Sequence, residues 1–355
     1  MMAQGGYRLH GLKLSYFTGK LEAYLQAKGI GFEFVEMDTA DFRRCGRATG
    51  FLQMPQLEAP DGSWLTDTTA IIRRFEADAP GPRLSPVTPL ATFTSRLLED
   101  AFDEWLWRPA LYYRWAFEDD ARLMSRQIAR SMLRDVPGPV WLKARIVRAR
   151  QVHEYLKRDG ITPKTAPIVA AQLHDLIDLL EPVLARRPFL LGERPSEADF
   201  GLFGPVFRHF SIDPTPAAIL RDRASNLLAW TTRLWALRPS DLEGLPEITT
   251  VPQDLRPLLG RIGESYLSYL AANALALSRG QGMVRYSDGG VAWTVPTSPY
   301  RGTCLQALQT DYLALSSKDQ VWMTEALGGH RLEDMPQGHP PPPPMVGKVL
   351  TRHGL

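Results

Sequence analysis

The chain has very few cysteines, because Cys45 and Cys304 are the only two among its 355 residues. Two cysteines cannot form the disulfide framework that stabilises small secreted proteins. Their small number fits a reducing compartment, and we therefore expect a cytoplasmic protein. The segment Met1–Gly6 has no charged region followed by an apolar core, so we expect no secretory signal peptide.

Long apolar runs and an excess of one charge are also missing. The longest weakly polar run, Tyr266–Leu277, is too short to span a bilayer and contains serine and asparagine. The 41 basic and 39 acidic residues leave a net charge of +2, which gives no strong field to attract nucleic acid. We therefore expect neither a membrane nor a nucleic acid as a partner.

Sequence motifs for metals and nucleotides are absent as well. The seven histidines show no spacing such as H-E-x-x-H, and no glycine-rich phosphate loop is present. We therefore expect no bound metal. What the chain does have is length and apolar content: 355 residues, 44% of them hydrophobic, suggest two domains with full cores and an appendage.

A strand, a short turn and a helix follow one another near the N-terminus. Tyr7–Leu14 alternates apolar and polar residues, which is typical of a half-buried strand. Ser15–Gly19 breaks this pattern. From Lys20 the apolar residues recur with a helical period as far as Gly29, which is a C-terminal stop signal. The turn therefore lies at the N-terminal end of a helix.

Two hydroxyl side chains, Ser15 and Thr18, lie in this turn. The first N–H groups of a helix have no partner within it and carry the positive end of its dipole, so an anion is stabilised there. Lowering the pKa of a thiol by one unit needs about 1.4 kcal/mol, which such a site can supply. Alternatively, Ser15 or Thr18 only caps the helix, and the neighbouring Tyr16 is either a further donor or a packing residue.

The residues that follow complete a small α/β unit. Phe32–Met37 alternates as a second strand, and the arginine-rich residues 38–50 are expected to form a loop with a short helix. Met54–Ala59 is typical of a third strand, Asp61-Gly62 is a hairpin signal before a short fourth strand, and a helix follows from Thr66 to about residue 77. The order βαβ and then ββα is thioredoxin-like.

Pro55 opens the third strand, and in such domains this proline is often cis. The backbone of Met54 would then face outward and pair with an extended peptide. Asp67 and Thr68 lie at the start of the next helix, where a carboxylate would meet N–H groups and a hydroxyl, and an ammonium would meet Asp67. A γ-glutamyl group carries both charges.

Residues 79–91 are expected to form a linker, because they contain Pro80, Pro82, Pro86 and Pro89. From 92 to about 245 the chain is predicted to be helical. Its first part is rich in aromatic residues, which either pack in the core or line a pocket; the pocket candidates are Trp107, Arg108 and Tyr112. The arginine stripe of Arg122–Arg134 is either a solvated helix face or an anion or partner site.

Two segments complete the chain. Residues 252–330 are predicted to form a helical extension with a β-hairpin around Ser287–Gly290. Residues 331–355 contain a polyproline run and are predicted to form a flexible tail.

Three stretches, in this order, resemble the glutathione transferases. The first is Ser15–Ile30, which has serine where serine-type members keep the hydroxyl that activates the thiol. The second is Gln53–Leu57 with Leu65–Ile71, which matches the family's Val-Pro-x-Leu and Glu/Asp-Ser/Thr-x-Ala-Ile elements. The third is Phe189–Phe200, whose Ser196-x-x-Asp199 is a capping box. The resemblance covers about residues 7–240 and leaves 252–330 outside the usual fold.

The resemblance implies a thioredoxin-like domain (1–78) that binds glutathione as co-substrate and an all-α domain (92–245) that walls the electrophile pocket. It implies a homodimer, although the extension could cover that interface. Ser15 would donate to the thiolate, with Tyr16 or Thr18 as alternatives. The implied glutathione-binding residues are Gln53, Met54, Pro55, Asp67, Thr68 and, as one candidate from its arginine-rich segment, Arg43.

The function implied is a glutathione-dependent transferase that activates the thiolate for attack on a small hydrophobic electrophile. Isomerisation or reductive cleavage through a glutathione adduct is equally compatible. No cysteine lies in the turn, which argues against glutaredoxin-like disulfide exchange. The alternative is a non-catalytic interaction protein that uses the same fold as a scaffold.

Overall fold

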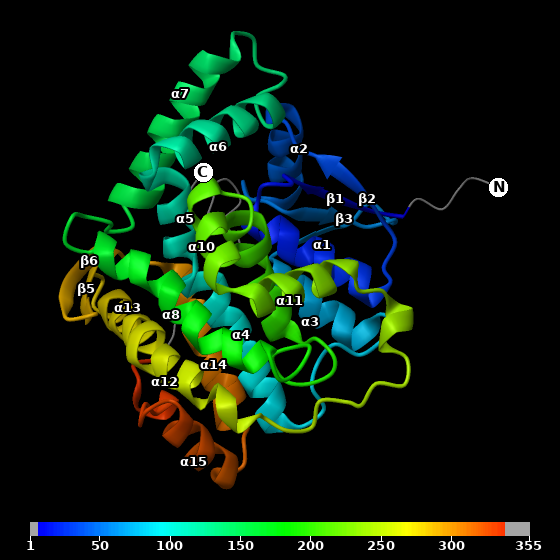
Figure 1. Cartoon of the computed structure of the whole chain (residues 1–355), viewed down its shortest axis with the longest axis vertical. Coiled ribbons are helices and arrows are strands. Elements are labelled where there is room, and N and C mark those ends of the chain that lie inside the picture. The colour runs from blue at the N-terminus through cyan, green and yellow to red at the C-terminus, as the bar shows by residue number, and fades with distance from the viewer. Residues whose placement is uncertain (1–5, 338–355) are drawn as a thin grey trace.

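The computed structural model describes residues 6–337 of the chain. They form a small α/β domain, a helical domain and a C-terminal extension, and Figure 1 shows the extension against the side of the helical domain. No helix in this range is long and apolar enough to cross a membrane.

The first domain is built on a four-stranded sheet with strand order β2-β1-β3-β4. Its strands are β1 (Tyr7–Gly11), β2 (Phe32–Glu36), β3 (Gln56–Glu58) and β4 (Trp64–Thr66). β1 runs parallel to β2 and antiparallel to β3, which places Leu9 beside both Phe34 and Leu57. Leu9 and Leu57 are fully buried in the core that the sheet shares with its helices. The thioredoxin-like α/β order predicted from the sequence is confirmed.

Three helices accompany this sheet: α1 (Tyr16–Lys28), α2 (Thr39–Thr49) and α3 (Thr68–Asp78). The prediction of a loop with a short helix at 38–50 is wrong, because α2 fills almost the whole segment. Its ends are well formed: Asp38 accepts the N–H of Asp41 at 2.9 Å, and Gly50 takes a left-handed conformation. The Met54–Pro55 peptide bond is cis, as expected.

The helical domain begins at residue 89. Its helices are α4 (Pro89–Trp105), α5 (Trp107–Ala116), α6 (Glu118–Ser131), α7 (Val140–Gln151), α8 (Ala166–Leu184), α9 (Glu197–Pro205), α10 (Pro214–Arg223) and α11 (Ser225–Ala236). α9 is buried on every side and contacts both α4 and α1. It begins with the predicted capping box, in which Asp199 also accepts the N–H of Leu190 at 2.9 Å and the indole N–H of Trp230 at 3.1 Å.

Buried charges join the first two domains. Lys20 of α1 is fully buried, and its Nζ lies 2.5 Å from Glu99 Oε1 and 2.6 Å from Asp103 Oδ2 of α4. Such buried ion pairs fix the relative position of two elements, because separating the partners leaves an uncompensated charge. Gly204 of α9 is also required, since a Cβ there would lie 2.8 Å from the carbonyl oxygen of Tyr16.

The extension contains α12 (Arg256–Ile262), α13 (Ser268–Ser278), the hairpin of β5 (Met283–Asp288) and β6 (Val291–Pro296), α14 (Pro299–Leu313) and α15 (Ser317–Ala326). α14 packs on α4, and α12 packs on α8. Buried side chains tie the extension to α4: Arg301 Nε donates to Glu104 Oε2 at 2.9 Å.

The first residues of the predicted tail are packed, so that part of the prediction is wrong. Leu332 is fully buried, and the Gln309 side chain donates to the carbonyl oxygens of Leu332 and Met335 at 3.1 and 3.3 Å. The polyproline run lies outside the described residues.

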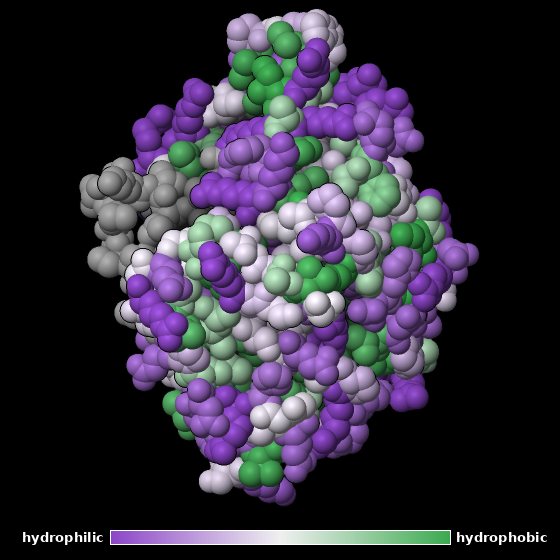
Figure 2. All heavy atoms as spheres, turned by 90° about the vertical axis from the view of Figure 1, so that its left-hand side faces the viewer, coloured by the Kyte–Doolittle hydropathy of each residue, from purple (hydrophilic) through white to green (hydrophobic). Residues whose placement is uncertain are grey.

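The hairpin of α6 and α7 has a mixed surface. Figure 2 shows mainly hydrophilic side chains on this face of the molecule, with apolar groups at its upper end. The arginines of the predicted stripe are all exposed, which agrees with a solvated helix face: Arg122, Arg126, Arg130 and Arg134. Trp141 and Ile146 of α7 are 61% and 60% exposed.

Candidate active site

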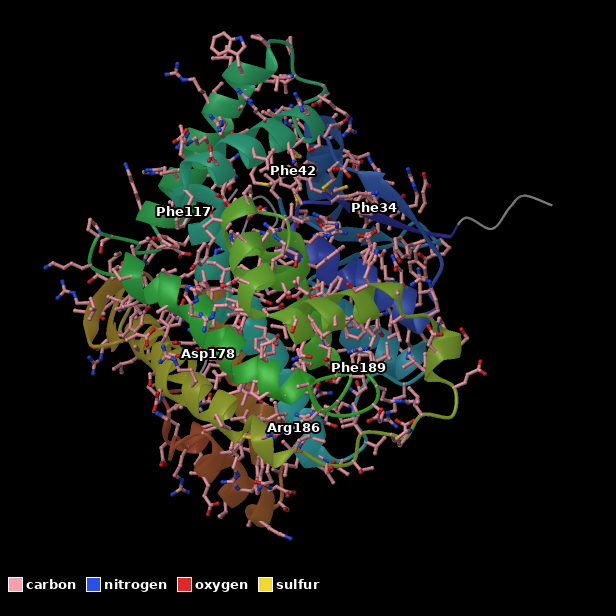
Figure 3. All side chains as sticks on the ribbon, in the orientation of Figure 1. Phe34, Phe42, Phe117, Asp178, Arg186 and Phe189 are labelled. Carbon is pink, nitrogen blue, oxygen red and sulfur yellow. The ribbon has the colours of Figure 1, made fainter. Side chains whose placement is uncertain are left out.

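A cavity of about 440 Å³ lies between the first domain and the helical domain. One wall comes from the turn before α1, from α2, from the loop before β3 and from the start of α3. The other wall comes from α5, from α6 and α7, and from the residues that follow these two helices, and its apolar residues are Trp107, Leu111, Trp115, Ile128, Met132, Leu133, Val147 and Tyr155. Phe42 of α2 also lines the cavity, and Figure 3 shows it between α2 and α6.

Ser15 lines the cavity at the N-terminal end of α1. α1 begins at Tyr16, four residues earlier than the sequence pattern suggested, so Ser15 is its N-cap. Ser15 Oγ accepts the N–H of Thr18 at 3.4 Å. No group in residues 6–337 accepts the hydroxyl proton of Ser15. The residue therefore caps the helix and still presents a donor beside the positive end of the helix dipole.

The other two hydroxyls of this region are placed differently. The Tyr16 ring lines the cavity, but its hydroxyl donates to the carbonyl oxygen of Phe102 in α4. Thr18 is fully buried and does not line the cavity. Of the three candidates, Ser15 alone combines a place on the cavity wall with a hydroxyl proton that is not donated within the described part of the chain.

The loop before β3 presents backbone groups to the cavity. Gln53, Met54 and Pro55 all line it, and Gln53 Nε2 is held by Thr66 Oγ1 at 2.5 Å. Within residues 6–337, neither the N–H nor the C=O of Met54 has a hydrogen-bond partner. A strand edge of this kind is where an extended peptide can add its own hydrogen bonds.

Asp67 and Thr68 line the cavity at the start of α3. Asp67 Oδ1 accepts the N–H of Thr69 at 3.1 Å and so caps the helix. Thr68 Oγ1 is buried and has no hydrogen-bond partner in the described part of the chain. A buried hydroxyl without a partner costs free energy, which a bound polar group would relieve.

The arginine-rich segment contributes one cation to the cavity. Arg43 lines it and is exposed, without an ion pair to any residue of 6–337. Arg44 points elsewhere, because its Nη2 lies 2.8 Å from Asp41 Oδ1. Arg47 is exposed and does not line the cavity.

Of the three predicted substrate-pocket residues, Trp107 lines the cavity and the other two do not. Arg108 is buried on the opposite side of α5, where Nη1 donates to the Tyr286 hydroxyl at 2.6 Å and the guanidinium faces Trp293 of the extension. Tyr112 packs against Tyr113 and Phe117. The placement of Arg108 and Tyr112 in the pocket is therefore corrected.

Three residues of the cavity wall with basic side chains were not among the predicted site residues: Arg114, Arg150 and His209. Burial, followed by the nearby charge of Arg114, lowers the pKa of His209 well below its ordinary value, so the imidazole is neutral. Arg114 is held by Asp213 in a buried pair at 2.8 Å. A single histidine in an apolar helix gives no signal in the sequence that could have identified it.

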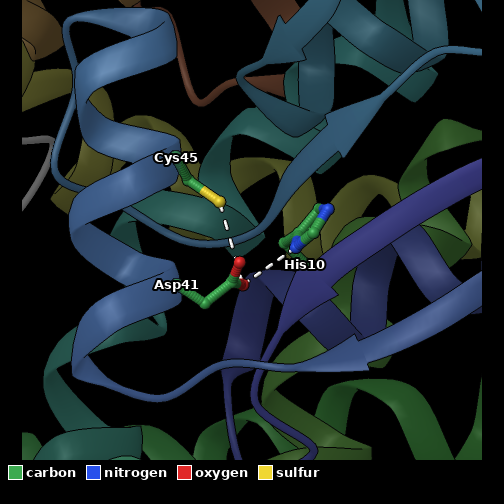
Figure 4. A group of neighbouring side chains, drawn as sticks. All are labelled: His10, Asp41 and Cys45. Carbon is green, nitrogen blue, oxygen red and sulfur yellow. Dashed lines mark hydrogen bonds and ion pairs between the residues drawn. The ribbon is translucent and has the colours of Figure 1, made fainter. Parts of the chain in front are cut away.

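Behind the cavity lies a cluster of possible metal ligands, shown in Figure 4. Asp41 Oδ2 lies 2.8 Å from His10 Nδ1 and 3.8 Å from Cys45 Sγ. Burial, and then the charge of Asp41, raises the pKa of Cys45 to about 12, so the thiol is protonated. Arg44 already supplies positive charge there. None of the three lines the cavity, and the cluster ties α2 to β1.

Comparison with known sequences matches both domains to one family. Residues 9–83 match the Glutathione S-transferase, N-terminal domain, and residues 139–233 match the Glutathione S-transferase, C-terminal domain. The chain therefore carries both domains of the glutathione S-transferase family. Members of this family use glutathione as co-substrate, as the resemblance implied. The extension lies after the second matched segment. No curated protein matches the chain.

Solved structures were compared as well. Beta-etherase LigF from Sphingobium sp. strain SYK-6 is 22% identical, with 67% of this chain and 98% of that chain covered and a TM-score of 0.46. A glutathione S-transferase from Methylobacterium radiotolerans, in complex with glutathione sulfonate, is 21% identical, with 70% and 98% covered and a TM-score of 0.40. FzlA from C. crescentus is 17% identical, with 70% and 97% covered and a TM-score of 0.42.

Proposed function

We propose that the chain is a glutathione-dependent transferase that activates the glutathione thiol for attack on a small hydrophobic electrophile. The observation that carries this proposal is the convergence of Ser15, Met54, Asp67 and Thr68 on one cavity. These residues come from three separate segments of the first domain. The wall that faces them belongs to the helical domain and is largely apolar.

The polar groups of the cavity suit a γ-glutamyl peptide in kind and position. The N–H and C=O of Met54 are available to pair with the cysteinyl unit. Asp67 suits the ammonium of the γ-glutamyl group, and the Thr68 hydroxyl suits its carboxylate at the helix N-terminus. Arg43 is the cation available for the glycyl carboxylate.

Ser15 acts on the sulfur without becoming the nucleophile. Its hydroxyl donates a hydrogen bond to the thiolate, and the N-terminal end of α1 adds favourable electrostatics. Both effects favour the ionised thiol, whose proton passes to solvent. The thiolate sulfur then forms a bond to the electrophilic atom of the substrate, and the leaving group departs with the electron pair of the bond that breaks.

The shape of the other wall indicates the class of electrophile. Trp107, Leu111 and Trp115 present apolar surface from α5, and residues of α6 and α7 extend it. A cavity of about 440 Å³ has the size of a small-molecule site. His209 is neutral at physiological pH, so the charges on this wall come from Arg114, which is paired with Asp213, and from Arg150. We therefore propose a small, mainly apolar or aromatic electrophile.

The first prediction tests the role of Ser15. In Ser15→Ala the thiol of bound glutathione should regain a pKa about one unit higher, because about 1.4 kcal/mol of thiolate stabilisation is lost. Titration of the thiolate by ultraviolet absorbance measures this, and the turnover of a model aromatic electrophile should fall about tenfold at neutral pH. The cap is lost as well, so stability should decrease by about 1 kcal/mol.

Two variants serve as matched controls for this experiment. Tyr16→Phe and Thr18→Val remove the neighbouring hydroxyls, which do not present a proton to the cavity, so the thiol pKa should stay at the wild-type value. The proposal is wrong if bound glutathione shows no lowered thiol pKa in the wild type. It is also wrong if Ser15→Ala leaves that pKa unchanged.

A further inference from the structure

The extension contacts the wall of the cavity. Tyr300, near the start of α14, donates its hydroxyl proton to Asp67 Oδ2 at 2.9 Å. The two residues are 233 positions apart in the chain. Asp67 itself lines the cavity, whereas Tyr300 stands behind it. A residue outside the two matched family domains is therefore in direct contact with the site.

The backbone conformation of Asp67 and the hydrogen bonds of its carboxylate show what the contact with Tyr300 does. Its φ angle is 71°, in the left-handed region that residues other than glycine rarely adopt. One carboxylate oxygen, Oδ1, is committed to the N–H groups of Thr69 and Ala70 at the start of α3. The other oxygen, Oδ2, is the one that Tyr300 contacts. The two sets of bonds together fix the plane of the carboxylate.

The residues on both sides of Tyr300 are held by buried contacts. The fully buried Asn273 of α13 clamps the residue before α14, because its Oδ1 accepts the N–H of Ser298 at 2.8 Å and its Nδ2 donates to the Ser298 carbonyl at 2.9 Å. On the other side of Tyr300, Arg301 is buried in its ion pair with Glu104. The tyrosine therefore lies between two anchored residues, and its position is set by the extension.

We propose that Tyr300 is a positioning residue that holds the Asp67 carboxylate in the orientation needed to bind the ammonium of the γ-glutamyl group. This rests on the proposed function. A carboxylate oxygen has more than one acceptor position, so Oδ2 accepts the tyrosine hydroxyl and an ammonium N–H together. The extension is then part of the glutathione site, and its role is to set the affinity for the γ-glutamyl end.

Calorimetric binding to the full chain tests this proposal. Tyr300→Phe removes only the hydroxyl and should raise the Kd for glutathione about tenfold, as expected for the loss of a hydrogen bond to a charged group. Cysteinylglycine lacks the γ-glutamyl group, so its weaker Kd should be the same for both proteins. Tyr312→Phe is the matched control, because it removes a hydroxyl that contacts Thr324 from the same helix. It should leave both constants unchanged.

The outcomes separate this proposal from the proposed function. If the wild type binds glutathione and Tyr300→Phe binds it equally well, the role of Tyr300 is disproved while the transferase assignment stands. An equal loss for both ligands would mean that Tyr300 only supports the fold, which also disproves it. In an Asp67→Asn background, Tyr300→Phe should cause no further loss, and an additive loss contradicts the proposal. A wild type without glutathione affinity disproves both.

Discussion

At the scale of single residues, side chains of the same type and in the same segment differ in whether they line the cavity. Arg43 and Arg47 are both exposed residues of α2, one turn apart, yet Arg43 alone of the two lines the cavity. Ser15 and Thr18 are both hydroxyls of one helix terminus, yet one faces the cavity and the other is fully buried. Whether a side chain can contact a ligand therefore depends on the side of the helix on which it lies, as well as on the residue type.

Arg43 gives the prediction that belongs to this scale. In Arg43→Met the Kd for glutathione should rise about tenfold, because a charge-assisted hydrogen bond to the glycyl carboxylate is lost. Glutathione ethyl ester, in which that carboxylate is blocked, should bind the variant and the wild type with the same Kd. Arg47→Met changes the same type of residue on the same helix and should bind glutathione normally. A loss of similar size in Arg47→Met would mean that α2 attracts the ligand only by its net charge.

At the scale of elements, α9 shows how a local sequence signal becomes a feature of the core. The capping box Ser196-x-x-Asp199 starts a helix whose residues are all buried, so its cap is buried too. Burial raises the pKa of Asp199 to about 6, although hydrogen bonds from the Leu190 and Ser196 N–H groups act in the opposite direction. The folded chain therefore holds this proton more tightly than the unfolded chain.

This shift sets the sign of a pH dependence. Between about pH 4 and pH 6 the folded state binds more protons at Asp199 than the unfolded state, so this carboxyl should lower the free energy of unfolding as the pH rises. In Asp199→Asn that contribution disappears, so the free energy of unfolding should fall less, or rise more, as the pH increases through this window. Urea unfolding of both proteins at several pH values measures the difference. Parallel curves for the two proteins would contradict the raised pKa.

How much the sequence predicts also differs between elements. The place of Ser15 at a helix N-terminus, the cis Pro55 and the hairpin of the extension follow from local chemistry, and local patterns are sufficient to predict them. Local patterns do not show which face of α5 lines the cavity, because aromatic residues occupy several sides of that helix. Trp107 and Arg108 are adjacent in sequence, but one lines the cavity and the other is buried against the extension. Only tertiary packing decides this.

The extent of α2 was missed for a similar reason. Residues 38–50 contain many charged and few apolar residues, so the sequence favoured a loop with a short helix. The helix is stabilised from outside, by the Asp38 cap and by the buried contact of Cys45 and Asp41 with β1. The sequence therefore could not single out Arg43 among the arginines of this segment, because its place on the cavity wall depends on α2.

At the scale of the whole molecule, the extension is an integral part of the fold. Arg301 and Glu104 form a buried pair across the contact between α14 and α4, with exposed fractions of 6% and 3%. Separating the extension from the helical domain would break this ion pair and would expose the apolar surface around it to water. Both effects cost free energy. We therefore expect the extension and the helical domain to unfold together. The expected homodimer and cytoplasmic location stay predictions.

Arg301→Met tests this coupling. It removes the Arg301 charge from the buried pair with Glu104 and should destabilise the chain by about 3–5 kcal/mol in a single shifted transition. Arg96→Met breaks the partly exposed pair with Asp311 across the same contact and should cost less than about 1 kcal/mol. Urea unfolding followed by tryptophan fluorescence and by far-ultraviolet circular dichroism should give coincident curves for both variants. A separate early transition in Arg301→Met would mean that the extension unfolds on its own.

The hydrogen bond between Tyr300 and Asp67 also has a consequence for the newly made protein. The two residues are 233 positions apart, and a ribosome adds about 5–20 residues each second, so roughly 10–50 s separate their synthesis. The first domain is fully synthesised before that interval ends, but the proposed γ-glutamyl end of its site still lacks Tyr300. Full affinity for glutathione is then reached only by the finished polypeptide, and a nascent or prematurely terminated chain would compete poorly for the cellular glutathione pool.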